Sequence, residues 1–559
     1  MDARGFLNRH HKKVFYSLWL MAGLLHAGLS GLLDDEAYYW MYGRFPAWGY
    51  FDHPPLTGVL TRAGTSLFND SLGVRFFFVL LSTATILGID SLLGKRDDRL
   101  FYAIVLGIGL LQFGGIIAVP DVPLMFFTVL FFLSYRRFVS IQGPFQILLM
   151  GLTTACMLYA KYHGVLVVLF TLLSNPRLFL RWQTYAAGLV ALLLFAPHLQ
   201  WQFNHDFPSF RYHLFERNAA EYKSEYTIEY LLGQLALAGP LIGWLLIWAA
   251  FRSKPFDDTE KALKYNLVGI YAFFLLSTFK GRVEANWTAP AFIPLVVLSH
   301  RFLTDRPNAS VWVHRLLPPS LLIVLVLRIY MMADIDPVAG VPKDEFHRNP
   351  EWAAAVMAKS GGLPVVFVNS YQRASQYIFQ TGREAFALND LFYRRNNYNF
   401  WPLEAPLMGR RVLVLSAEDT LRFRDSVTSP RPMLRALEVE GYFSFSQVDI
   451  RMDTAPVISD GRLKGRLKVH VPADLQASPV YGRFDTAKIV ALLYSRSLRE
   501  SVPIETGVSL RDAAEGMVDI EITVEETPSE VFRKVKWGIR SAVPGHPSLN
   551  STEYRIERR

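Results

Sequence analysis

The 559-residue sequence contains a single cysteine, Cys156, and few charged residues. One thiol excludes an intramolecular disulfide and a cysteine-rich metal cluster. Charged residues make up only 19% of the chain, whereas hydrophobic residues make up 51%, and the mean hydropathy is +0.20. This composition is too apolar for an ordinary soluble protein and indicates a membrane protein.

The charge is distributed unevenly along the chain. Residues 1–334 hold 28 Lys and Arg and 21 Asp and Glu, whereas the shorter segment 335–559 holds 30 and 28. We therefore expect a membrane-embedded domain over 1–334 and a soluble domain over 335–559. Most of the net charge of +9 lies in the first segment, where Lys and Arg set membrane orientation, so nucleic acid is not an expected partner.

The hydropathy pattern predicts a polytopic α-helical membrane protein with about eleven spans, since a span needs about 20 apolar residues and shorter ones occur inside a bundle. The predicted spans are 14–33, 73–93, 100–118, 121–138, 145–159, 163–174, 184–197, 231–251, 265–279, 288–303 and 317–333. Clusters of Lys and Arg fall at alternate connections, beginning with the basic N-terminus. The positive-inside rule then places the N-terminus in the cytoplasm, and the loops 34–72 and 198–230 and the C-terminal domain outside it, at a plasma (inner) membrane.

The soluble segment begins with a β-α-β pattern formed by LPVVFVNS, YQRASQYIFQTG and AFALND. RRVLVLSAED predicts a further strand of the same sheet. Beyond residue 435, the alternation in LKVHV, AKIVALLYS and MVDIEITVEE predicts an all-β module. We therefore expect an extracytoplasmic α/β plus β domain that is subdivided near 435.

The first outer loop concentrates carboxylates near the membrane face. Asp34, Asp35 and Glu36 are adjacent, and Asp52 follows among aromatic residues. One interpretation is a helix cap, in which the three carboxylates precede a helix that starts at Ala37. The alternative is an active site, and these residues alone do not separate the two.

Several motifs in a fixed order favour the active site. DDEAYYW, FDHPPL, the Pro120-Asp121 dipeptide, KYHG at 161–164 and KGRVEANWTAPAFIPL at 280–295 together resemble the bacterial branch of the dolichyl-phosphate-mannose protein mannosyltransferase superfamily, which includes the aminoarabinose lipid A transferases. The resemblance covers about 1–330 and extends weakly to 401. It implies a C-type glycosyltransferase fold and an inverting transfer of a sugar from a polyprenyl-phosphate donor. The acceptor would be a hydroxyl of a lipopolysaccharide or other lipid, a polysaccharide or a protein, at the outer membrane face.

The resemblance also assigns the acidic residues of the site. It places Asp35 beside the acceptor, followed by Glu36, and makes Asp121 a second acidic position. The transfer breaks a C1–O bond and needs a carboxylate that accepts the proton of the attacking hydroxyl. Direct attack with one carboxylate base gives inversion, so we predict that Asp35 is the base. The alternative for Asp121 is a carboxylate at a helix N-terminus.

The departing phosphate requires a cationic clamp, because negative charge grows on it as the bond breaks. The predicted clamp residues are Lys161, Arg217, Lys280 and Arg282, together with His53, which stands where the aminoarabinose transferases carry a Lys. The alternative for these cations is snorkelling at the membrane interface.

The same resemblance implies a divalent metal ion and contacts to the donor sugar. Asp52 and His213 are the expected metal ligands, and a structural role for His213 is the alternative. Asn286 and Trp287 are expected to contact the donor sugar, although Trp287 also fits an interfacial aromatic belt.

A transporter or flippase of polyprenyl-linked sugars would also need many spans and embedded charges. Such a protein should show related halves, and this chain has no recognisable internal repeat and carries its charges at the ends of outer loops. A protein that acts through its C-terminal domain alone would not need eleven spans. We therefore favour the enzyme, and expect RRNNYNFW at 394–401 to bind sugars or anionic lipid or to pack against the membrane domain.

Overall fold

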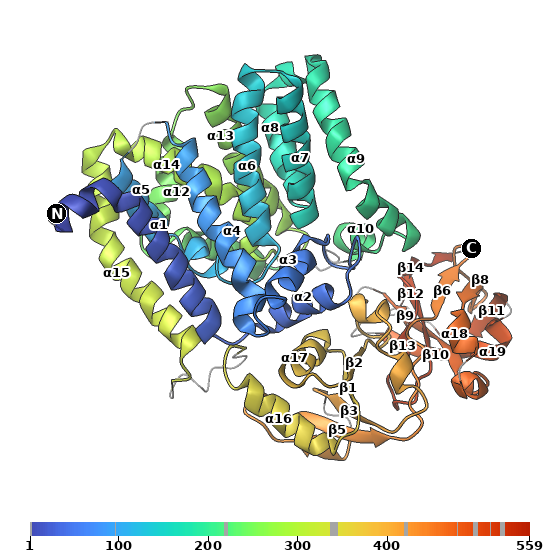
Figure 1. The fold of residues 1–559 in the computed structure, drawn as a ribbon. Coiled ribbons are helices and arrows are strands. Elements are labelled where there is room, and N and C mark those ends of the chain that lie inside the picture. Colours follow the sequence, from blue (N-terminus) through green and yellow to red (C-terminus); the bar gives the residue numbers. More distant parts are fainter. Residues whose placement is uncertain are drawn as a thin grey trace. The chain divides into compact units, whose positions relative to one another are not determined.

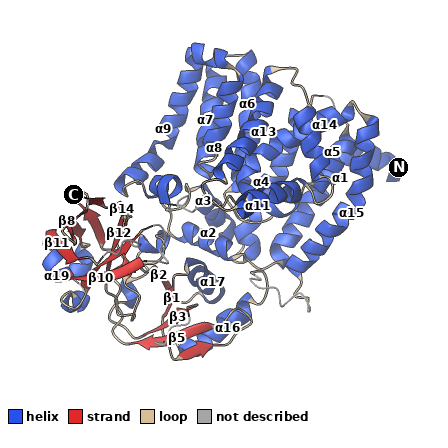
Figure 2. Ribbon diagram, turned by 180° about the vertical axis from the view of Figure 1, so that it is seen from behind, coloured by secondary structure: helices blue, strands red, loops and turns tan. Residues whose placement is uncertain are grey.

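The computed structural model describes residues 3–94, 97–216, 222–335, 345–418, 423–477, 479–495, 501–514, 516–525 and 531–558. The chain divides into two compact units, Met1–Val341 and Pro342–Arg559. The first unit is built from helices, and the second holds all the described strands (Figures 1 and 2). The change of architecture follows the change in charge density along the sequence.

The N-terminal unit contains fifteen described α-helices joined by short connections and single turns of other helix types. The α-helices are α1 (Ala3–Leu29), α2 (Asp34–Arg44), α3 (Leu56–Thr65), α4 (Ser71–Leu92), α5 (Asp98–Gly107), α6 (Asp121–Ser140), α7 (Pro144–Ala160), α8 (Gly164–Ser174), α9 (Trp182–Asn204), α10 (Pro208–Arg211), α11 (Ser224–Ala238), α12 (Gly243–Arg252), α13 (Asp258–Ser277), α14 (Phe292–Thr304) and α15 (Pro307–Met332). The other turns are the π-helices η1 (Leu110–Gly114) and η3 (Tyr212–Glu216) and the 3-10 helices η2 (Pro176–Leu180) and η4 (Ala285–Ala291).

Four of the described helices, α4, α6, α9 and α15, are long and apolar enough to cross a membrane. Two bent pairs raise this number to six if each pair is one span. They are His10–Leu29 with α2, bent by 92°, and α11 with α12, bent by 93°. The helices α7 and α8 are apolar but shorter. The count of eleven spans therefore stays a prediction.

Three predicted segments differ from the structure. The loop 34–72 contains α2 and α3, and α2 begins at Asp34 rather than at Ala37, so the three adjacent carboxylates form its first turn. The predicted span 231–251 is two helices with a bend at Gly239, whose φ of 135° favours glycine. The predicted span 100–118 is α5 followed by η1, and an irregular segment then leads into α6.

The helices of the N-terminal unit pack closely together. α7 packs against both α6 and α9, α4 packs against α1, α3 and α6, and α8 packs against α13 (Figure 1). A continuous core of buried apolar side chains runs through α5, α6, α12, α13 and α14. Buried polar side chains lie at the ends of several helices, such as Glu36 at the start of α2 and Asp121 at the start of α6.

The C-terminal unit begins with a five-stranded sheet in the order β2-β1-β3-β5-β4. β1 (Val365–Val368) pairs in parallel with β2 (Ala385–Leu388) and β3 (Val412–Ser416), while β5 (Leu434–Val439) pairs antiparallel with β3 and β4 (Asp425–Val427). The helix α17 (Tyr371–Thr381) connects β1 to β2 and follows α16 (Asn349–Ser360). The predicted β-α-β pattern and its third strand are confirmed, but the division near 435 falls inside β5.

The rest of the C-terminal unit is mainly β-structure, as predicted. Two sheets have the orders β10-β9-β12-β13, with β14 paired to β12, and β11-β8-β7-β15, with β6 paired to β8. The strands are β6 (Asp449–Met452), β7 (Val457–Ser459), β8 (Arg462–His470), β9 (Lys488–Tyr494), β10 (Ser501–Ser509), β11 (Met517–Thr523), β12 (Lys534–Ile539), β13 (Ser548–Leu549), β14 (Tyr554–Arg555) and β15 (Glu557–Arg558).

The segment RRNNYNFW is largely built into the C-terminal unit. The side chains of Asn389, Asn396 and Asn399 are buried and hydrogen-bond to one another. Arg395 forms an ion pair with Asp449 at 3.1 Å. These contacts use the amides and one guanidinium within the C-terminal unit. Binding of sugars or anionic lipid, and packing against the membrane domain, both stay predictions.

Candidate active site

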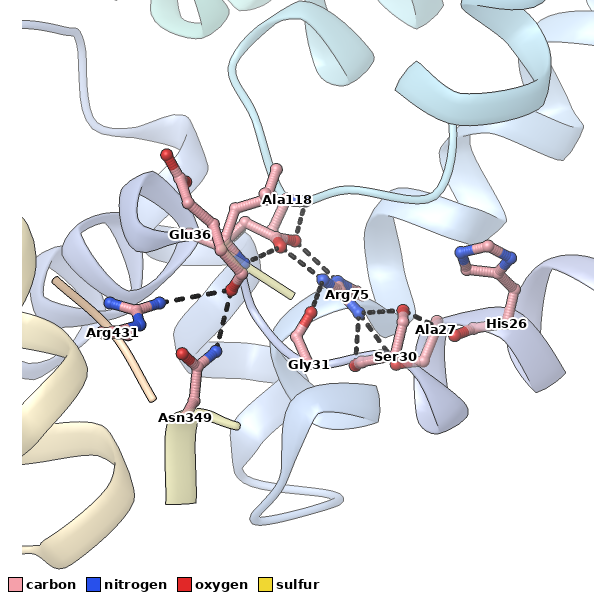
Figure 3. Close-up of polar contacts among 11 residues, drawn as sticks. His26, Ala27, Ser30, Gly31, Glu36, Arg75, Ala118, Asn349 and Arg431 are labelled. Atoms are coloured by element: carbon pink, nitrogen blue, oxygen red, sulfur yellow. Dashed lines mark hydrogen bonds and ion pairs between the residues drawn. The ribbon is translucent and has the colours of Figure 1, made fainter. Parts of the chain in front are cut away.

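A fully buried ion pair between Glu36 and Arg75 organises the start of α2. Arg75, on α4, donates from Nε to Oε1 of Glu36 at 2.7 Å and from Nη2 to Oε2 at 2.5 Å. The same carboxylate accepts hydrogen bonds from the backbone N–H groups of Leu33 at 2.9 Å and Ala118 at 2.7 Å (Figure 3). Glu36 therefore fixes both the first turn of α2 and the segment that leads to α6.

Arg75 also binds the C-terminal end of α1. Its Nη1 donates to the carbonyl groups of Ala27 and Ser30 and to the Ser30 hydroxyl, and its Nη2 donates to the carbonyl of Gly31 (Figure 3). The last carbonyls of a helix lack intrahelical partners and favour a cation. Arg75 is not among the residues predicted for the site, although a lone Arg in an apolar run indicates a buried partner.

Asp35 and Glu36 are neighbours in very different environments. Asp35 is exposed, whereas Glu36 has no exposed surface. Both carboxylate oxygens of Glu36 accept hydrogen bonds from protein donors, so this residue is suited to position the first turn of α2 rather than to react. Asp35, the predicted base, is an exposed residue of the same turn.

A second cluster joins three of the predicted site residues. Asp121 is the first residue of α6 and is buried, and the Nζ of Lys161 lies 2.8 and 3.0 Å from its two carboxylate oxygens. Asn286, in η4, donates to Oδ2 of Asp121 at 2.9 Å. A cavity of about 110 Å³ reaches Asp121 and Asn286, and its other lining residues are mainly apolar ones of η1, α6 and the segment between them, with Ser82 and Thr85 of α4. The carboxylate at the edge of this cavity is therefore paired with a buried cation.

A third cluster brings the first outer loop to the segment after α9. The hydroxyl of Tyr38, on α2, donates to Oδ2 of Asp52 at 2.8 Å. The Nε2 of His213 lies 2.9 Å from the backbone carbonyl oxygen of Asp52, and the rings of His53 and His213 are 6.3 Å apart. Asp52 and His213 do meet, as predicted, but the contact uses the main chain of Asp52.

This donor set does not fit a metal centre. Among the residues that the structure describes, no group of three or more His, Cys, Asp or Glu side chains is arranged to hold an ion. The carboxylate of Asp52 accepts a hydrogen bond from Tyr38, and a ring nitrogen of His213 that faces a carbonyl must donate. Metal sites usually need three or four ligands, so no step proposed below uses a metal.

We expect His213→Gln to retain more activity than His213→Ala. A glutamine amide can still donate to the carbonyl of Asp52, whereas alanine leaves that carbonyl without this donor, and the difference should be about 3- to 10-fold in turnover. Turnover of both purified variants, before and after thorough chelation, measures the effect. Equal losses in both variants, reproduced by chelation of the unchanged protein, would show that His213 is a metal ligand instead.

The other predicted cations are less enclosed than Lys161. Arg282 is exposed and pairs with Glu229 at 3.2 Å and with Glu284 at 4.0 Å. Lys280 is exposed as well, and Arg217 lies outside the described residues. Lys161 is therefore the predicted clamp residue that the structure places most favourably for a lipid phosphate.

Trp287 is half-buried and packs beside other rings of the N-terminal unit, and an interfacial belt stays the alternative for it. Its ring is 5.5 Å from the ring of His163 and 5.8 Å from that of Phe274, and it packs against the apolar core. Together with the bond from Asn286 to Asp121, this packing places η4 beside the second cluster. Contact of either residue with a donor sugar stays a prediction.

Comparisons with known proteins agree with this architecture. Residues 52–201 match the family model described as dolichyl-phosphate-mannose-protein mannosyltransferase. Over 302 residues the chain is 23% identical to the lipid A galacturonosyltransferase RgtD of Rhizobium johnstonii, which covers 51% of this chain and 63% of the relative. The chain thus matches less than two thirds of that relative's length.

The fold is similar to that of ArnT from Cupriavidus metallidurans. The apo structure of ArnT gives a TM-score of 0.56 at 13% identity, covering 77% of this chain and 98% of ArnT. The structure bound to undecaprenyl phosphate gives 0.55 at 15% identity, covering 78% and 98%. These likenesses confirm the predicted C-type fold and its multi-pass membrane architecture.

Proposed function

We propose that this chain, as a member of the mannosyltransferase- and ArnT-like glycosyltransferase family, transfers a sugar from a polyprenyl-phosphate donor to an acceptor hydroxyl. The observation that carries the proposal is the buried Asp121–Lys161–Asn286 cluster at an apolar cavity. A lipid phosphate combines the two properties that this cluster suits, a negative charge and an apolar tail. The ArnT structure bound to undecaprenyl phosphate supports the same class of donor.

The proposed reaction is a single displacement at the anomeric carbon. The acceptor hydroxyl attacks C1 of the sugar, its proton passes to the carboxylate of Asp35, and the C1–O bond to the phosphate breaks. The phosphate leaves with the bonding electrons. Lys161 carries three N–H donors and uses two contacts on Asp121, so its third is directed to the growing phosphate charge. Attack opposite the leaving group inverts the sugar configuration.

We place the reaction at the outer face of an inner membrane, with the N-terminus in the cytoplasm and the C-terminal unit outside. The alternating Lys and Arg clusters support this orientation. A reporter that is active only outside the cytoplasm should work when fused at Arg559 and fail when fused after Arg137. The reverse pattern would overturn the orientation.

A lipid A-type glycolipid is the first acceptor to test, because the curated relative is named as a lipid A galacturonosyltransferase. Purified protein should be incubated with polyprenyl-phosphate sugars and with glycolipid, polysaccharide and protein acceptors, and the products followed by mass spectrometry. A covalent sugar adduct with release of the polyprenyl phosphate supports the proposal. Movement of the donor between leaflets without any adduct would favour the flippase alternative.

Lys161→Gln is expected to weaken donor binding by about 10- to 100-fold, since a hydrogen bond to a charged group contributes about 1.5–3 kcal/mol. Arg282→Gln is the control, because its guanidinium is exposed and shared with two carboxylates, and it should change binding by less than about 3-fold. Titration with a polyprenyl-phosphate sugar gives both affinities. A larger loss of donor affinity in the Arg282 variant than in the Lys161 variant would indicate that the 280–282 connection binds the phosphate instead.

A further inference from the structure

Three alternate carbonyl groups of the first outer loop accept hydrogen bonds from side chains of one distant segment. The pairs, with the donor first, are His198 with Trp48 at 2.7 Å, Ser209 with Tyr50 at 2.9 Å and His213 with Asp52 at 2.9 Å. All three carbonyl groups therefore face the 198–213 segment, whose side chains hold the loop.

Tyr162 lies at the centre of the network that makes two of these contacts. His198 donates from Nδ1 to a carbonyl, so in its neutral form Nε2 is an acceptor, and the Tyr162 hydroxyl donates to it at 2.9 Å. The same hydroxyl accepts from Nε2 of Gln202 at 2.9 Å, and Gln202 also donates to Ser209 at 2.7 Å. In this series of hydrogen bonds, each donor faces a group that can accept.

Three of the four side chains of this network are fully buried, and Tyr162 is half-buried. His198, Gln202 and Ser209 have no exposed surface. Burial raises the pKa of the Tyr162 hydroxyl above its ordinary value, so the hydroxyl stays protonated and can donate. Buried polar groups in such a network are costly to leave without partners, so the loss of one member should affect the others.

Gly49 provides independent support for close contact between the loop and α9. A Cβ at this position would lie 2.5 Å from the ring of Trp201 and 2.9 Å from Nδ1 of His198. Real Cβ contacts are not this short, so a side chain at position 49 would push the loop away from α9. The loop and α9 are therefore packed at backbone contact distance.

The KYHG motif links this network to the second cluster, which is formed by Asp121, Lys161 and Asn286. Lys161 binds Asp121, the adjacent Tyr162 holds the loop network, and His163 packs on Trp287. On the other side of the loop, Asp52 accepts a hydrogen bond from Tyr38 on α2, the helix that carries Asp35. One short connection thus joins the proposed phosphate-binding cation to the element that bears the proposed base.

We propose that Tyr162 is a positioning residue that, through His198, Gln202 and Ser209, fixes the first outer loop and α2 relative to Lys161. The inference rests on the proposed function, because it assigns Lys161 to the donor and Asp35 to the acceptor. Tyr162 acts through the loop and does not contact the reacting atoms. Loss of the Tyr162 hydroxyl should misplace the acceptor substrate relative to the sugar donor, but it should not remove any contact between the protein and the sugar donor.

The test compares Tyr162→Phe with Tyr159→Phe. Tyr159 is a matched control because it lies on the preceding helix, its hydroxyl donates to the carbonyl of Leu194 at an exposed position, and Phe keeps its ring contacts with His198 and Trp48. We expect Tyr162→Phe to reduce turnover by about 10- to 100-fold, since small misplacements have effects of this size, with donor affinity within about 2-fold of the unchanged protein. Equal turnover in the two variants, or a matching loss of donor affinity in Tyr162→Phe, would overturn the inference.

A double-mutant cycle with Ser209→Ala separates a connected network from two local effects. If the network acts as a unit, Tyr162→Phe with Ser209→Ala should lose little more turnover than the more impaired single variant. Multiplicative losses would show that the two residues act independently and would contradict the role proposed for Tyr162.

Hydrogen exchange gives a readout that does not depend on sugar transfer. Amides in residues 45–53 should exchange roughly tenfold faster in Tyr162→Phe than in Tyr159→Phe, because His198 and Ser209, which bind two of the three loop carbonyls, lose the hydroxyl that orients them directly or through Gln202. If the unchanged protein transfers no sugar but shows this difference, the proposed function fails and the loop network stands. Equal exchange in the two variants would overturn the network whatever the activity.

Discussion

Asp35→Asn is expected to reduce the rate of sugar transfer by about 10²- to 10⁴-fold, the range for a positioned proton acceptor. Asparagine has nearly the same size and can still form hydrogen bonds, but it cannot take the proton of the attacking hydroxyl. The structure strengthens this expectation because Asp35 is exposed, whereas the adjacent Glu36 is enclosed by donors.

Donor binding should change little in the same variant. The donor phosphate is assigned to Lys161, which binds Asp121, and Asp35 lines neither this pair nor the cavity beside it. Single-turnover transfer, measured beside a donor-binding titration on folded protein, separates the two effects. A loss of donor affinity as large as the loss of rate would show that Asp35 serves binding rather than proton transfer.

Asp34→Asn is the matched control because Asp34 and Asp35 share the first turn of α2. A carboxylate that only stabilises a helix N-terminus contributes about 0.3–1 kcal/mol, so this variant should melt slightly earlier and transfer sugar at nearly the normal rate. Normal transfer by Asp35→Asn with impaired transfer by Asp34→Asn would move the base by one residue. Normal transfer by both would leave the carboxylates as a helix cap and reject the mechanism.

The sequence motifs predicted several residues of the candidate site, but they did not predict which of these residues contact one another. Asp121, Lys161 and Asn286 were each predicted from separate motifs, and the structure joins them in one cluster. What could not be predicted is that Asn286 orients Asp121, because a contact between residues 165 positions apart depends on how the helices pack. Family motifs name residue types, while their partners follow from tertiary structure.

Two predicted segments contain features that their sequence patterns do not register. Hydropathy alone treats 231–251 as one apolar run, since it does not register that Gly239 bends the chain by its positive φ. Alternation alone divided the C-terminal domain near 435, inside β5, because a strand that completes an α/β sheet shows the same pattern as one in a β module. Arg75 was overlooked for a related reason, since its partner lies 39 residues away on another helix.

Removing either member of the Glu36–Arg75 pair is expected to destabilise the protein by about 3–5 kcal/mol, because the remaining charge would be buried without its partner. Both side chains have no exposed surface, so water cannot replace the lost contacts. Glu36→Leu and Arg75→Leu should therefore unfold at clearly lower temperatures in detergent. Arg62→Leu is the control, because Arg62 donates to the carbonyl of Gly43 from a position that is only partly buried.

The double variant Glu36→Leu with Arg75→Leu shows whether the pair does more than neutralise charge. Replacing a simple buried ion pair by two apolar residues often restores stability. Here the restoration should fail, because the N–H groups of Leu33 and Ala118 and the carbonyls at the end of α1 would all lose their partners, each at a cost of about 1–3 kcal/mol. A double variant as stable as the unchanged protein would mean that these backbone groups find other partners. The Glu36–Arg75 pair would then not be what fixes α2 and the segment that leads to Asp121.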